Sequence, residues 1–200
     1  MKKNIRFIIT GIIILFGVYL YAHIGKTHNI YDQNVDTSQY KATAIYTIDS
    51  VEQEFECTED YMDGIKLKCK LSGNTASVSV KMVLKEKETG ETVAETQIFG
   101  EGLEESKFYF FEFDRINNCR GKQFVLSISE EGADAANYVD FCYTDGEEES
   151  TRLYFDGQEA DGTMVIRTVT NRFDVETFCV LLVFVIYVWG FMRFLYCLFR

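Results

Sequence analysis

The chain carries two long apolar segments, one near each end, and every charge on the outer flank of each segment is positive. Residues 7–24 form the first segment and residues 178–199 the second, and all thirty-one acidic residues lie between positions 32 and 176. An apolar segment of about 20 residues can cross a hydrocarbon core, and flanking basic residues mark the cytoplasmic side. The sequence therefore predicts a two-pass membrane protein with both termini in the cytoplasm and an acidic domain outside. The basic residues that flank or lie inside the segments are Lys2, Lys3, Arg6, Arg193 and Arg200.

This topology divides the chain into four parts. We expect a cytoplasmic N-terminus (1–6), a transmembrane helix that acts as an uncleaved signal anchor (7–24), an extracytoplasmic domain (25–175) and a second transmembrane helix (176–199). The alternative for the first segment is a signal peptide cleaved near Gly25, although the preceding residues are a poor match to the small-residue cleavage pattern.

The charge of the middle part restricts its partners. Residues 25–175 contain fifteen Lys and Arg against thirty Asp and Glu, a net charge of −15. A surface of this charge repels phosphate backbones, so we expect no nucleic acid as a partner. About 150 residues is the size of one ordinary domain with its own core.

Short runs of alternating or aromatic residues, separated by turn residues, predict strands throughout this domain. In residues 64–71 the alternation places Ile65, Leu67 and Cys69 on an inward face and three lysines on the outward face. About ten such runs at regular spacing predict an antiparallel β-sandwich. The expected strands are Ala42–Ile48, Gln53–Cys57, Gly64–Leu71, Ala76–Leu84, Thr92–Phe99, Phe108–Phe113, Phe124–Ile128, Tyr138–Tyr143, Arg152–Asp156 and Thr163–Val169. The turn residues at 72–74, at 87–91 and at Asp156-Gly157 predict hairpins.

Several short motifs within these strands resemble a known domain family. They are Phe55 with the following acidic loop, Met62-Asp63-Gly64-Ile65, Phe111-Glu112-Phe113-Asp114, Gly121-Lys122-Gln123-Phe124-Val125-Leu126 and Leu153-Tyr154-Phe155-Asp156-Gly157. In order and spacing, residues 53–167 resemble the external jelly-roll, galactose-binding-like β-sandwich of Gram-positive bacterial membrane proteins linked to cell-surface polysaccharide assembly. The resemblance implies a bacterial cell membrane location. Because it includes no multi-span glycosyltransferase or polymerase region, it also implies an accessory domain and not the enzyme.

Four of the six cysteines belong to the external domain. An even number in an oxidising compartment favours two disulfides, and free buried thiols are the alternative. If strand directions alternate, Cys57, Cys119 and Cys142 lie at the same end of the sandwich and Cys69 lies nearer the opposite end. Cys57 then has two candidate partners, Cys119 and Cys142.

No motif in the sequence indicates a catalytic, metal or cofactor site. The cysteines lack C-x-x-C spacing, and the only histidines, His23 and His28, follow the first apolar segment closely. The Glu147-Glu148-Glu149 run is interpreted as a solvated loop. We therefore expect no enzyme activity and no cofactor.

Exposed aromatic residues are the best candidates for binding. Sugars dock on aromatic faces through their C–H groups. Alternation in residues 108–113 turns Phe108 and Phe110 away from the face of Phe111, and Tyr61 lies at the end of the strand that contains Gly64. We take Tyr61, Phe108 and Phe110 as candidate binding residues, with ordinary packing of a covered strand as the alternative.

These observations lead to one main functional hypothesis and two alternatives. The main hypothesis is a non-catalytic accessory or scaffold protein in cell-envelope glycan assembly, held in the membrane by two helices beside a multi-span membrane protein or a glycan. The alternatives are a glycan-binding module and a small envelope hydrolase.

Overall fold

The computed structural model describes residues 2–146 and 148–199, with side chains from residue 9 onward. Contacts divide the chain into two compact units. Residues 27–170 form one unit, and the other combines the two ends of the chain, up to Lys26 and from Asn171. The boundaries of the central unit fall slightly inside the 25–175 expected from the sequence.

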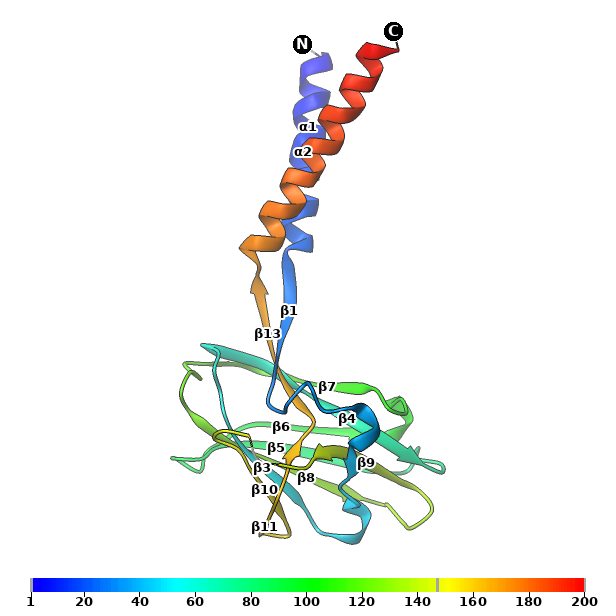
Figure 1. Cartoon of the computed structure of the whole chain (residues 1–200), viewed down its shortest axis with the longest axis vertical. Helices are drawn as coiled ribbons and strands as arrows, with labels where there is room; N and C mark the ends of the chain where they lie inside the picture. Colours follow the sequence, from blue (N-terminus) through cyan, green and yellow to red (C-terminus); the bar gives the residue numbers. More distant parts are fainter. Residues whose placement is uncertain (1, 147, 200) are drawn as a thin grey trace. The chain divides into compact units, whose positions relative to one another are not determined.

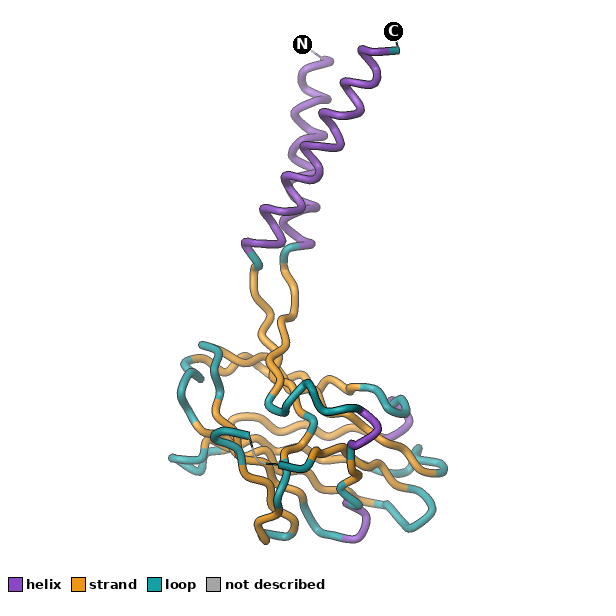
Figure 2. Tube along the Cα trace, in the orientation of Figure 1, coloured by secondary structure: helices purple, strands orange, loops and turns teal. Residues whose placement is uncertain are grey.

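The central unit is a sandwich of two antiparallel β-sheets, as expected (Figure 1). The first sheet contains β1 (His23–Asn29), β2 (Lys41–Ala42), β4 (Tyr61–Ser72), β7 (Phe108–Asn117), β9 (Tyr138–Thr144), β12 (Thr163–Met164) and β13 (Ile166–Phe173). The second contains β3 (Val51–Glu56), β5 (Ser79–Glu86), β6 (Thr92–Phe99), β8 (Gln123–Glu131), β10 (Arg152–Phe155) and β11 (Gln158–Ala160). Three short 3-10 helices, Thr37–Gln39, Ile45–Thr47 and Gly100–Gly102, lie in the loops (Figure 2).

Strand order explains how the two sheets enclose one core. The first sheet runs β1-β13-β4-β9-β12, with β2 beside β9 and β7 beside β4, and the second runs β11-β10-β3-β8-β5-β6. The largest fully buried side chains include Phe55, Phe111, Phe124 and Phe141, which come from both sheets. Phe55 and Phe124 are register partners whose ring centroids lie 6.0 Å apart. Burying each ring contributes roughly 1.5–3 kcal/mol, so these rings hold the sheets together.

Where a strand contact is local in sequence, the prediction from alternation and turn residues is confirmed. In β4 the predicted inward residues Ile65, Leu67 and Cys69 are fully buried. Strands β5 and β6 form the expected hairpin, and β10 and β11 are joined by the Asp156-Gly157 turn, where both residues have positive φ. Two positive φ values in a two-residue loop are typical of the turns that match strand twist.

Three expectations about the strands are wrong. The run 42–48 is not a strand beyond Ala42, because Ala44 takes a left-handed conformation and a 3-10 turn follows at Ile45–Thr47. β4 and β5 do not pair across the turn at residues 72–74, since they belong to opposite sheets. The expected strand 163–169 is split into β12 and β13 at Val165, whose side chain is buried apart from the main core.

The unit formed by the two chain ends contains helices α1 (Lys2–Tyr21) and α2 (Val175–Leu198), which lie side by side (Figure 1). Among the described residues, α2 is the helix long and apolar enough to cross a membrane, and the apolar part of α1, Ile9–Tyr21, is shorter. Helix α1 ends three residues before the expected boundary at position 24, because His23 and Ile24 already belong to β1.

The start of α2 is fixed by Asp174. Its carboxylate accepts hydrogen bonds from the backbone N–H (3.1 Å) and the hydroxyl of Thr177, and it pairs with Lys26 at 2.7 Å. The Lys26 ammonium, with the Thr177 groups, lowers the pKa of Asp174 to about 2. The helix therefore begins on an ionised cap that satisfies an exposed N–H group.

Candidate functional site

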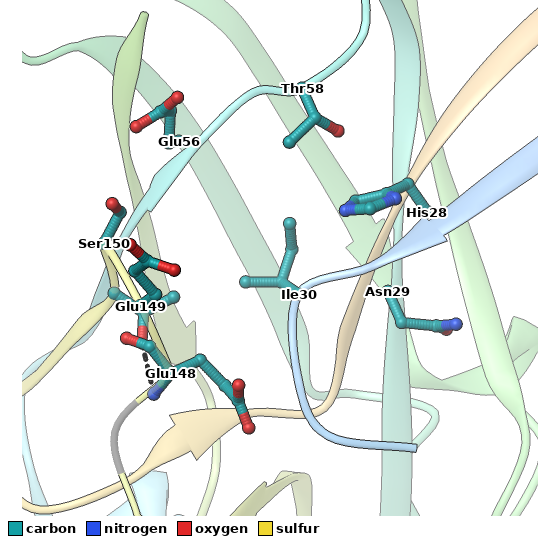
Figure 3. Close-up of a pocket in the computed structure, with 9 residues that line it drawn as sticks. His28, Asn29, Ile30, Glu56, Thr58, Glu148, Glu149 and Ser150 are labelled. Atoms are coloured by element: carbon teal, nitrogen blue, oxygen red, sulfur yellow. Dashed lines mark hydrogen bonds between the residues drawn. The ribbon is translucent and has the colours of Figure 1, made fainter. Parts of the chain in front are cut away.

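A cavity of about 420 Å³ opens on the sandwich between three segments far apart in the sequence. It is lined by the end of β1 and the next residue, by the end of β3 and the loop that follows it, and by the loop before β10. In Figure 3 the carboxylates Glu56, Glu148 and Glu149 lie along one side and His28 on the other, with Ile30 between them. A second, adjoining cavity of about 690 Å³ shares the loop that carries Glu148 and Glu149.

Two buried threonines, Thr151 and Thr163, hold the loop that carries Glu148 and Glu149. The backbone N–H of Glu148 donates to Thr151 Oγ1 (3.1 Å) and to Thr163 Oγ1 (3.3 Å), and the Thr151 N–H returns to Glu148 O at 3.1 Å. The two threonine hydroxyls lie 3.1 Å apart and both residues are buried. This tight turn keeps the carboxylates of Glu148 and Glu149 at the rim of the cavity.

The chemistry of the cavity is that of a hydrogen-bond acceptor site. Three carboxylates and one imidazole suit the hydroxyl or amine groups of a polar ligand. Within residues 2–146 and 148–199, no three His, Cys, Asp or Glu side chains converge in a way that would hold a metal ion. Residue 147, part of the acidic run singled out in the sequence, lies outside the described residues.

The sequence-predicted residues Phe108 and Phe110 lie elsewhere, on the outer face of the first sheet. Both are half-buried, and both are in contact with cations. The guanidinium carbon of Arg167 lies 3.9 Å from the centroid of the Phe108 ring, and Lys66 Nζ lies 5.5 Å from that of Phe110. Phe110 lies over Gly64, where an added Cβ would come within 2.2 Å of the ring.

Two tyrosines from the segment that crosses this sheet complete the surface. Tyr31 and Tyr40 meet edge to face at 6.1 Å, and the Tyr31 hydroxyl accepts a hydrogen bond from Arg167 at 3.0 Å. Lys68 Nζ lies 5.1 Å from the Tyr40 ring centroid. Burial, with the neighbouring Tyr31, raises the pKa of Tyr40 to about 12, so this phenol stays neutral. We call this surface the cation–aromatic face; it consists of Tyr31, Tyr40, Lys66, Lys68, Lys70, Phe108, Phe110 and Arg167.

The third predicted binding residue, Tyr61, is not part of this surface. It begins β4 opposite Asn117, seven residues from the Lys68–Phe108 pair, a distance of roughly 20 Å along a strand. Its ring is covered by Arg115, whose guanidinium carbon lies 4.0 Å from the centroid and which binds Asp63 at 2.7 and 3.1 Å. Tyr61 therefore lies beside an ion pair at the opposite end of the strand.

Of the three candidate disulfide cysteines, the structure brings Cys57 and Cys119 together. Both are buried, and the interaction between the two thiols lowers the pKa of Cys57 and raises that of Cys119. Each thiol donates to a nearby backbone carbonyl, Cys57 to Glu59 O at 3.5 Å and Cys119 to Ile116 O at 3.2 Å. Cys142 lies in a separate cluster with Tyr31 and Val165. Because Cys142 follows the register partner of Cys69 along β9, it lies toward the opposite end from Cys57. The disulfide itself stays a prediction.

Sequence reasoning did not find the cavity residues. The position of His28 close to the first apolar segment argues against a site there, and the acidic run that includes Glu148 and Glu149 predicts a solvated loop. No local pattern joins positions 28, 56 and 148, because the strands that carry them are brought together by the sheets. The residue types alone, a histidine and a run of acids in loops, were the available indication.

Comparisons with known proteins give no family. No model of a protein family matches the chain, and no curated protein matches it. Among solved structures, it is similar to the infectious bursal disease virus VP2 subviral particle, at 14% identity, 74% of this chain, 37% of that chain and a TM-score of 0.25. It is also similar to the Gt strain of the same virus, at 14% identity, with 74% and 38% coverage and a TM-score of 0.22. The chain spans less than two-fifths of the length of these structures.

Proposed function

We propose that this protein is a membrane-tethered, extracytoplasmic β-sandwich that acts as a non-catalytic accessory or scaffold in cell-envelope glycan assembly. The observation that carries this proposal is the join between the last strand and the apolar helix. Strand β13 ends at Phe173 and α2 begins at Val175, with the capping residue Asp174 between them. A sandwich joined so directly to a membrane-spanning helix is suited to hold a binding surface close to a membrane-embedded partner.

In this proposal both apolar segments cross the membrane, both termini are cytoplasmic, and the sandwich belongs to the jelly-roll, galactose-binding-like class. The basic residues at the outer ends of the two segments, Lys2, Lys3, Arg6 and Arg200, support this orientation, because Lys and Arg beside a span favour the cytoplasmic side. The side-by-side packing of α1 and α2 supports two spans. Gly11 and Ile14 of α1 and Trp189 of α2 line the same apolar groove.

The test is cross-linked purification of the full-length protein from membranes of the bacterium that encodes it. The control is a variant whose α2 is replaced by a polyleucine helix of the same length, which keeps the anchor and changes its surface. Recovery of a glycan-assembly enzyme with the native chain and its loss with the control would support the scaffold function. Turnover of a wall polymer by the purified protein, abolished by Glu148→Gln, would overturn it.

A second candidate function is a glycan-binding module. The cation–aromatic face favours it, because aromatic rings and charged groups presented together on one sheet are suited to bind a sugar polymer. The two functions are compatible, since an accessory protein can position the polymer that its partner makes.

A further inference from the structure

The cations of this acidic domain fall into two groups. Nine salt bridges join a lysine or arginine to a carboxylate among the described residues. None of the nine includes Lys66, Lys68, Lys70 or Arg167, and these four have no carboxylate oxygen within 4.0 Å in the part of the chain that the structure describes. In a domain with two acids for each base, a cluster of cations that form no salt bridge requires an explanation.

The four cations form a compact row on adjacent strands. The three lysines alternate along β4, and Arg167 of β13 is the register partner of Lys66. With a rise of about 3.4 Å per residue and about 4.8 Å between strands, the row from Lys66 to Lys70 is roughly 14 Å long, and Arg167 lies beside one end. One small anion cannot reach all four charges, whereas an extended polyanion can.

The surrounding aromatic rings hold these cations in fixed positions. Arg167 lies between the Phe108 ring and the Tyr31 hydroxyl, and its Nε atom is buried without a hydrogen-bond partner among the described residues. Lys68 lies within 5.8 Å of the Phe108 ring centroid, as well as near Tyr40. Cations held by rings lose less side-chain freedom when they bind an anion, because part of their order is already present.

Two carboxylates are on the side of this surface. Glu112 of β7 is exposed opposite Gly64, beyond the Lys66 end of the row, and Asp140 is already engaged by other donors. Asp140 is the register partner of Lys70, so its side chain is on the same face. Its oxygens accept hydrogen bonds from the hydroxyl of Thr43, the N–H of Ala44 (3.1 Å) and the N–H of Phe141 (2.9 Å). Asp140 therefore fixes the neighbouring loop and forms no ion pair with the cationic row, whose four members are partly exposed.

We propose that the cation–aromatic face binds a linear anionic polysaccharide, with Lys66, Lys68, Lys70 and Arg167 on successive carboxylates of the polymer. This inference rests on the proposed extracytoplasmic, glycan-related function and names the ligand class. The length of the row favours a polymer over a single ion. The half-buried rings of Phe108 and Phe110 provide apolar edges for sugar C–H groups beside the charges. The net charge of −15 opposes the higher charge density of a nucleic acid.

The experiment measures binding of the full-length protein, in neutral detergent micelles, to soluble polygalacturonate. The fully methyl-esterified polymer has the same backbone without charge and is the matched ligand control. The test variant is Lys66→Gln with Lys70→Gln. The matched protein control is Lys81→Gln with Lys85→Gln, which removes the same charge at the same spacing on β5 of the other sheet. Thermal melts of both variants establish that they fold.

The native chain and the β5 variant should bind the charged polymer, with affinity that falls as salt rises, and should not bind the ester. The β4 variant should bind roughly tenfold more weakly, as expected when two surface ion pairs are lost. Equal binding of the ester, equal loss in the two variants, or equally tight binding of poly-glutamate would each overturn the inference. If the β4 variant retains cross-linking to its membrane partner while polysaccharide binding fails, the proposed scaffold function stands and this inference does not.

Discussion

Glu130 provides the most direct test of the electrostatics of the core. In β8 alternate residues face inward, so Glu130 follows Leu126 and Ile128 on the buried face and is the register partner of buried Val80. Both carboxylate oxygens are buried and have no hydrogen-bond partner among the described residues. Burial, with a smaller contribution from the charge of Asp140, raises the pKa of Glu130 to about 8.

This pKa shift has a definite consequence for stability. An acid whose folded pKa lies above its ordinary value of 4.5 holds a proton in the native state that the unfolded chain has released. Between about pH 4.5 and about pH 8 the unfolded state therefore binds fewer protons, and the free energy of unfolding falls as pH rises. The full shift corresponds to roughly 5 kcal/mol at 1.36 kcal/mol per pH unit. Because solvent still screens part of the side chain, we expect a loss of about 2 kcal/mol.

The variant Glu130→Gln removes the titration and keeps the shape of the side chain. Thermal unfolding of the full-length protein in neutral micelles, followed by near-UV circular dichroism, is compared at about pH 5 and about pH 9, which together span most of the window of the titration. From the lower to the higher pH, the melting temperature of the native chain should fall by roughly 4–8 °C more than that of the variant. For a domain of this size, each kcal/mol of stability changes the melting temperature by about 2–4 °C. The control is Glu131→Gln, the exposed neighbour, which should behave like the native chain. An equal loss in native chain and Glu130→Gln would refute the reasoning.

Three further changes test other parts of the sandwich. Gln53→Leu should lower the free energy of unfolding by about 2 kcal/mol, measured by denaturant titration. The fully buried Gln53 amide donates to a carbonyl of β10 at 3.0 Å and accepts from an N–H of β12 at 2.8 Å, and the variant loses both bonds. An unchanged midpoint would contradict this. Gly64→Ala should lower the melting temperature, because the added methyl group would overlap the Phe110 ring, and retention of the native value would show that the ring moves freely. Peptide mass mapping under non-reducing conditions should find a disulfide between Cys57 and Cys119. Closing this loop in the unfolded chain would raise the free energy of unfolding by about 4 kcal/mol. A peptide that joins Cys57 to Cys142 would disprove the pairing.

Local patterns in the sequence predicted the orientation of side chains but not which strands pair. Alternation correctly turned Ile65 and Leu67 inward, because the two-residue period of a strand depends only on its own residues. Residues 42–48 failed because Ala44 adopts a positive φ, a cost that only the hydrogen bonds of the fold can offset. The pairing of β4 with β7, β9 and β13 depends on long-range burial, which no window of the sequence contains.

The same limit applies to the candidate binding surfaces: the sequence predicts which way a side chain points, but not which side chains meet. The sequence predicted that Phe108 and Phe110 face outward and, separately, that the lysines of residues 64–71 do the same. The register that places Lys66 opposite Phe110 and Lys68 opposite Phe108 is visible only in the folded sheet. That register changes the chemistry, because a ring already in contact with a cation is less open for a neutral sugar to stack on. The aromatic residues then act chiefly by holding charges in place, which is why we propose an anionic ligand for this face and not a neutral one.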